Sequence, residues 1–157
     1  MLLLLLTPAW AGHTNVVLEA ILDGRGEVAT DADTRRIVGD PNGRGEAYVF
    51  GIDGDAFTLC YVLLVDKIAL VPVGSGMAAH IHEGVRGENG PIVAVLAGPE
   101  DGNAADCLTE GEAGKFPTNE VGIVQRILNH PEDFYINVHN PQYPGGAVRG
   151  QLEYTHE

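Results

Sequence analysis

Two histidines placed two residues apart are the part of this sequence best suited to chemistry. They occur in residues 78–84, Ala-Ala-His-Ile-His-Glu-Gly, in a chain of 157 residues with six histidines. If this segment is a β-strand, its alternation puts His80 and His82 on one face and Ile81 on the other. Two imidazoles fixed side by side on a strand provide half of a metal site.

A third histidine, His139, ends a segment with the same alternation, residues 135–139, Tyr-Ile-Asn-Val-His. Three neutral imidazoles from two strands can bind Cu(II), Cu(I) or Zn(II). We expect copper first, because imidazole-only ligation suits copper in an oxidising compartment, and zinc second. A fourth ligand could be His130, His13, the amine of a processed N-terminus, or water.

A structural role is the alternative for these histidines. His80, His82 and His139 could instead form a hydrogen-bonded polar cluster with Asn137 and Tyr135 that stabilises strand pairing. Single histidines usually have such roles, but convergence of three from two strands favours a metal site.

Arg149 is the candidate for binding an anionic substrate beside the metal. A small anion such as superoxide would be concentrated by this positive charge. The formal net charge of −13 opposes this, so the hypothesis requires a local positive patch to which Arg86 or Lys115 contributes. The alternative for Arg149 is a salt bridge to an acidic neighbour such as Glu83.

Other classes of function have little support in the sequence. The net charge of −13 argues against nucleic acid and anionic membrane surfaces as partners. Serine occurs once, at Ser75, so no Ser/His/Asp set can form. The acidic residues have no spacing that indicates a glycosidase.

Short strands must position the histidines. The chain is 45% hydrophobic and contains 21 glycines and 9 prolines, which favours many short strands separated by turns. One helical segment is expected at 121–129, a loop excursion at 97–115 and a turn at 140–146. This pattern predicts a Greek-key β-sandwich or barrel of about eight antiparallel strands with little helix. We expect strands at 14–22, 45–52, 56–65, 77–83, 92–96, 134–139 and 147–154, with a further short one near 36–38.

In the strand expected at 56–65, alternation puts Phe57, Leu59 and Leu63 on one face. In the last strand it directs Val148, Leu152 and Tyr154 inward, and Arg149, Gln151 and Glu153 outward.

The N-terminus and the two cysteines indicate an exported protein. Residues 1–11 form an apolar run that ends in Ala-Trp-Ala, the pattern of a signal-peptide remnant that is too short to span a bilayer. This predicts a single β domain over 12–157 that is secreted or periplasmic. In that setting Cys60 and Cys107 are expected to form a disulfide, worth about 4 kcal/mol. Two buried thiols or a thiolate metal ligand are the alternatives.

Two parts of the sequence resemble the chordin-type (CHRD) domain. Residues 79–84, AHIHEG, followed by 87–93, GENGPIV, resemble its first half. Residues 129–140, NHPEDFYINVHN, followed by 143–152, YPGGAVRGQL, resemble its second half. The resemblance covers nearly all of 14–153 and implies an extracellular β-sandwich domain, for which an extracellular protein partner is a further expectation. His130 lies at a position that varies in this family, and His13 lies outside the motif.

The order of the histidines is also similar to that in Cu,Zn superoxide dismutase. The counterparts are His80, His82, His139 and Arg149, whereas the zinc loop of that enzyme has no match. The first hypothesis is therefore an exported copper-binding enzyme that dismutates superoxide. The second is a non-catalytic extracellular binding or copper-sequestering module with the same fold.

Overall fold

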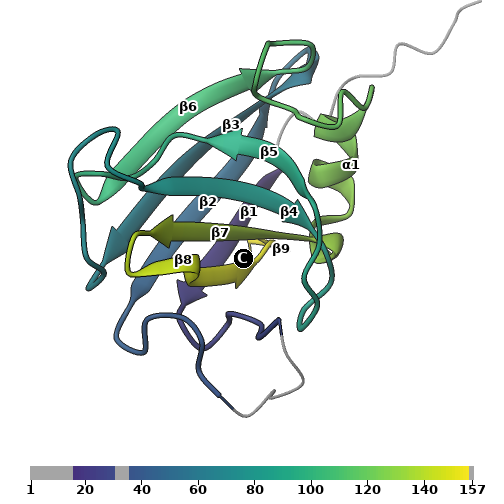
Figure 1. Ribbon diagram of the computed structural model, residues 1–157. Helices are drawn as coiled ribbons and strands as arrows, with labels where there is room; N and C mark the ends of the chain where they lie inside the picture. Colours follow the sequence, from purple (N-terminus) through teal and green to yellow (C-terminus); the bar gives the residue numbers. More distant parts are fainter. Residues whose placement is uncertain (1–15, 31–35, 156–157) are drawn as a thin grey trace, which may run out of the picture.

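The protein is an all-β domain with one short α-helix (Figure 1). The computed structural model describes residues 16–30 and 36–155, so the predicted signal remnant and His13 lie outside the described residues. The elements are β1 (Val17–Asp23), β2 (Arg44–Ile52), β3 (Asp55–Asp66), β4 (Ala78–Glu83), β5 (Ile92–Leu96), β6 (Asn103–Thr109), α1 (Ile123–Asn129), a 3-10 turn (Pro131–Asp133), β7 (Phe134–Asn140), β8 (Tyr143–Gln151) and β9 (Glu153–Tyr154).

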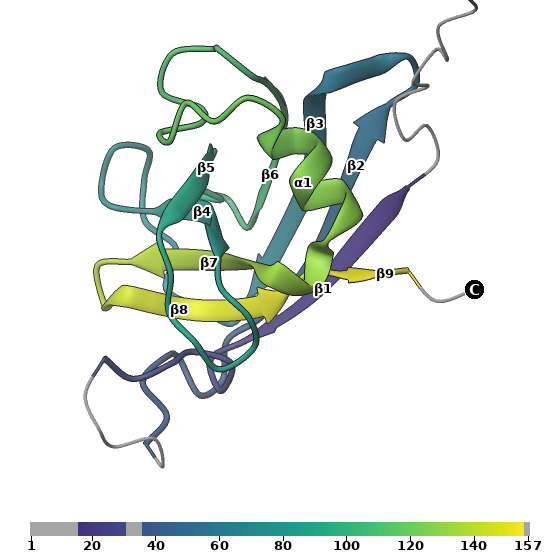
Figure 2. The same ribbon diagram turned by 90° about the vertical axis from the view of Figure 1, so that its right-hand side faces the viewer.

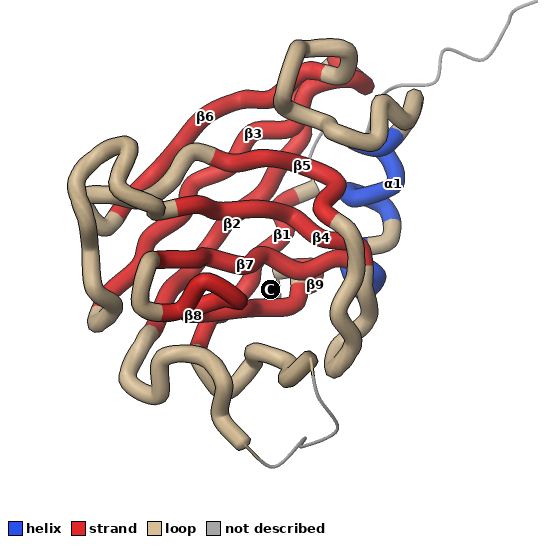
Figure 3. The backbone as a smooth tube through the Cα atoms, viewed as in Figure 1, coloured by secondary structure: helices blue, strands red, loops and turns tan. Residues whose placement is uncertain are grey.

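All strands belong to one antiparallel sheet of nine strands. The order is β5-β4-β7-β8-β1-β2-β3-β6, and β9 pairs with β1. The sheet curls so that its two ends face each other, which gives a nearly closed barrel (Figure 3). The expectation of an all-β, barrel-like fold with little helix is confirmed.

The core fills the inside of the curled sheet. Alternate residues such as Ile81, Ile136 and Val138 are fully buried there, so their neighbours in sequence face outward. Helix α1 lies at one end of the barrel (Figure 2) and contributes four fully buried side chains, Ile123, Val124, Ile127 and Leu128.

The expected excursion at 97–115 contains a strand, which corrects the prediction of a loop. β6 pairs with β3 and places Cys107 directly opposite Cys60. The two cysteines form the predicted disulfide, with 4.0 Å between their Cα atoms. Acidic and small residues hide the strand in the sequence, but Ala104 and Leu108 still point inward and are buried.

Three smaller expectations are wrong. The turn predicted at 140–146 is shorter, because β8 begins at Tyr143. Tyr154 is 48% exposed instead of inward, and its hydroxyl donates to the Asn129 carbonyl. Residues 36–43 contain no strand. Among the described residues, no helix is long and apolar enough to cross a membrane.

Candidate metal site

Strand register brings the three predicted histidines together on the outer face of the sheet. In the β4–β7 ladder, His80 lies opposite Asn137, His82 opposite Tyr135, and Ala78 opposite His139. One potential ligand atom from each histidine lies within 4.8 Å of the others. The ring centroids are 5.1 Å apart for His80 and His139, 5.6 Å for His80 and His82, and 6.3 Å for His82 and His139.

Backbone carbonyls fix the tautomers of two of these rings. His82 Nδ1 lies 2.9 Å from the Gly90 carbonyl, and His139 Nδ1 lies 3.0 Å from the Pro144 carbonyl. Because a carbonyl oxygen only accepts hydrogen bonds, each Nδ1 must carry the proton. Each Nε2 therefore presents a lone pair, and neither Nε2 has a hydrogen-bond partner although both are buried. Metal-ligating histidines are typically held in this way.

The third histidine also presents an unpaired nitrogen. His80 Nδ1 is buried and has no hydrogen-bond partner. Burial lowers the pKa of His80 to about 4, assisted by the neighbouring His139 and His82. Burial also lowers the pKa of His82 and of His139 below the usual value. All three rings are therefore neutral at pH 7, which is the form that binds a metal ion.

This donor set fits a copper or zinc ion better than a structural cluster. A hydrogen-bonded cluster would satisfy the buried nitrogens, whereas one nitrogen on each ring is left without a partner. Among the described residues, no side-chain hydrogen bond joins one of these histidines to the Asn137 or Tyr135 side chain. Three neutral imidazole nitrogens are ligands that both metals accept.

Arg149 is separated from the histidines by an aromatic ring. The Tyr135 ring stacks on His82 at 4.8 Å between centroids and 8° between planes. The Arg149 guanidinium carbon lies 3.4 Å from the centroid of the same Tyr135 ring. Arg149 is only 3% exposed. It therefore supports the His82 ring through Tyr135 and adds positive charge nearby.

Arg149 also holds the loop that orients His82. Its guanidinium donates to the Asn89 side chain and to the carbonyls of Val85 and Glu88. The same loop supplies Gly90, whose carbonyl orients His82 and whose N–H donates to the Tyr135 hydroxyl. A side chain at position 90 would collide with the Glu83 carbonyl, since a Cβ would lie 1.6 Å from that oxygen.

The salt bridge considered for Arg149 is not present. Glu83 pairs instead with Arg126 of α1, through contacts of 2.6 and 2.9 Å, and Arg126 also binds Glu120. His130 does not join the cluster. It caps the C-terminus of α1, its side chain is 61% exposed, and its Nδ1 lies 3.9 Å from Glu132.

Sequence reasoning missed a buried carboxyl group beside the site. Glu27, in the loop after β1, is 8% exposed, and its Oε2 accepts a hydrogen bond from Asn137 Nδ2 at 3.2 Å. Burial raises the pKa of Glu27 to about 8, against the lowering effects of Arg149 and Asn137. Its carboxyl group packs where a Cβ at Gly146 would lie. A loop glutamate gives no periodic signal, so only the tertiary structure identifies it.

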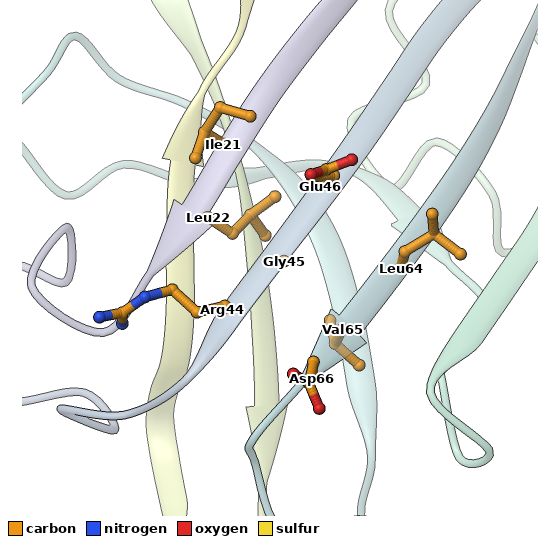
Figure 4. A pocket seen from close by; sticks show the side chains of 8 residues that line it. All are labelled: Ile21, Leu22, Arg44, Gly45, Glu46, Leu64, Val65 and Asp66. Carbon is orange, nitrogen blue, oxygen red and sulfur yellow. The ribbon is translucent and has the colours of Figure 1, made fainter.

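A separate hollow on the described surface lies away from the histidines. It has a volume of about 450 Å³ and lies over β1, β2 and β3, as Figure 4 shows. Its lining combines apolar side chains such as Ile21 and Leu64 with Arg44, Glu46 and Asp66, and it includes no histidine. Its chemistry therefore does not bear on the histidine cluster.

Comparison with known families identifies the domain. The family model for the CHRD domain matches residues 18–152. The chain belongs to the CHRD domain family. The three histidines lie within the matched part of this CHRD domain, as do Tyr135, Arg149 and the disulfide. No curated protein and no solved structure matches the chain.

Proposed function

We propose that this CHRD domain binds copper through His80, His82 and His139. The observation that carries the proposal is the pair of carbonyl contacts to His82 and His139 Nδ1, which leaves both Nε2 lone pairs buried and unpaired. The cost of burying such groups is recovered when a metal ion binds them.

Copper is preferred over zinc for its chemistry in an exported protein. The disulfide and the family are compatible with an extracellular or periplasmic location, where an oxidising environment is expected. The same three histidines could hold zinc in a structural role. His80 and His139 are only half-buried, so a small molecule or water can complete the coordination.

The candidate activity is superoxide dismutation, in which two superoxide ions and two protons give dioxygen and hydrogen peroxide. Bound copper would supply the one-electron redox chemistry. The residues of the chain would hold the metal and attract the anion, and Arg149 would supply nearby positive charge, acting from behind Tyr135. The alternative is a copper-sequestering module with no turnover.

Metal content and turnover should be measured on one sample. The purified protein is loaded with Cu(II) or Zn(II), freed of excess metal and analysed for bound metal, and superoxide consumption is then assayed. The test variants are His80→Ala and His82→Ala. The matched control is His130→Ala, which removes a histidine outside the cluster.

Near-stoichiometric copper in the wild type and in the control, lost in both test variants, would support the proposed site. Turnover that follows the copper content would support the enzyme. Copper without turnover would support the sequestering module. Equal copper in all four proteins, or none in the wild type, would refute the site.

A further inference from the structure

Three arginines from separate segments line one pocket on the outer surface. The pocket has a volume of about 270 Å³, and its charged lining consists of Arg25, Arg86, Arg149 and Asp23. Arg25 comes from the loop after β1, Arg86 from the loop after β4, and Arg149 from β8. The chain has only nine lysines and arginines in total, so this is a marked concentration of positive charge.

The positive charge in this pocket is poorly compensated. Among the described residues, neither Arg25 nor Arg149 has a carboxylate within ion-pair distance. Arg149 binds only neutral oxygens of the 85–89 loop. Arg86 pairs with the exposed Glu153. Asp23 is the one acidic residue in the lining, and its Oδ1 accepts the Gly26 N–H.

The neighbouring buried carboxyl does little to neutralise Arg149. Burial raises the pKa of Glu27 to about 8, so this group is mostly uncharged at pH 7. Burial lowers the pKa of Arg149, Tyr135 and the ionised fraction of Glu27 act to raise it, and the nearby Arg86 lowers it further. The two guanidinium groups therefore repel each other, and an anion between them would relieve this repulsion.

We propose that this pocket binds a tetrahedral oxyanion, either free phosphate or sulfate or the same group carried on a larger molecule. Guanidinium groups pair with such oxyanions through charge-assisted hydrogen bonds. Three of them around one pocket match an anion with oxygens in several directions better than a planar carboxylate, which offers two. The pocket includes none of the three histidines, so this proposal stands whether or not they bind copper.

The test uses inorganic phosphate as the probe. Binding to the metal-free protein is measured by isothermal titration calorimetry at constant ionic strength, with chloride as the reference anion. The variants are Arg25→Gln and Arg86→Gln, both on exposed loop positions. Arg149 is not varied, because it also holds the loop that orients His82. Arg44→Gln on β2, which removes the same charge outside this pocket, is the matched control.

We expect phosphate to bind the wild type and the control with equal affinity. Each test variant should bind phosphate about tenfold more weakly, because it lacks one charge-assisted hydrogen bond. Methyl phosphate is titrated in parallel, since tighter binding of the ester indicates a phosphate group on a larger molecule and tighter binding of the free ion indicates free phosphate. Absence of phosphate binding beyond the chloride reference, or equal binding by all four proteins, would overturn the proposal.

Discussion

Replacement of Glu27 by glutamine should change the pH dependence of stability. The buried carboxyl has a pKa of about 8 in the folded protein, against an ordinary value of 4.5. This shift corresponds to about 5 kcal/mol in total. Glutamine keeps an oxygen that can accept the Asn137 hydrogen bond, but it has no charge at any pH. The variant therefore isolates the cost of ionising Glu27.

The sign follows from which state binds the proton more tightly. A raised folded pKa means that the folded protein holds a proton that the unfolded chain releases. The stabilisation is complete below about pH 4.5 and is lost as the pH rises through about 8. Relative to Glu27→Gln, the wild type should lose about 3 kcal/mol by pH 7 and about 5 kcal/mol by pH 9. Such losses are a large part of a typical domain's stability.

Urea unfolding over this pH range measures the difference directly. Both proteins are kept metal-free with a chelator, because a bound metal would add its own pH dependence. The histidines titrate in both proteins, so their contribution cancels. Glu46→Gln, on an exposed position of β2, is the control and should follow the wild type. A constant difference between wild type and Glu27→Gln from about pH 4 to about pH 9 would refute the assignment of a neutral buried Glu27.

Three further measurements test other parts of the structure. The double variant Cys60→Ser, Cys107→Ser should lose about 4 kcal/mol in urea unfolding, because the disulfide closes a loop with a sequence separation of 47; a loss below about 1 kcal/mol would contradict this. Gln151→Leu should cost about 2 kcal/mol, since its buried amide nitrogen donates to the carbonyls at positions 84, 132 and 134; an unchanged unfolding midpoint would show that water replaces these contacts. Cu(II) at 100 times its Kd should stabilise the wild type and His130→Ala by about 2.7 kcal/mol but leave the melting temperature of His82→Ala unchanged; equal stabilisation of all three would place the copper elsewhere.

The sequence predicts the features that depend on strand alternation. It does not predict the features that depend on contacts with segments distant in the sequence. The period of two in 78–84 and 135–139 is sufficient to put His80, His82 and His139 on one face, and the β4–β7 register then brings them together. The same rule fails for Tyr154, because β8 ends at Gln151 and the short β9 that follows pairs with β1 alone. It also does not reveal that Arg149 and Gln151, on the outer face, are buried beneath loops.

The partners of charged residues were the least predictable feature. Glu83 could pair with any cation that the fold brings near, and the choice of Arg126 depends on how α1 docks against the barrel. Glu27 contacts Asn137 across 110 positions of sequence, and no local pattern contains such a contact. The carbonyls that orient His82 and His139 likewise belong to loops whose path is set by glycines and by Arg149.

The pairing of β9 with β1 has a consequence for how this domain can be joined to others. Leu18 lies opposite Tyr154, and the Thr155 N–H donates to the Val17 carbonyl at 3.2 Å. The polypeptide therefore enters and leaves the described domain at neighbouring points on one side of the barrel. A domain of this geometry can be inserted into a surface loop of a host protein, or joined in tandem through short linkers, without stretching across the fold.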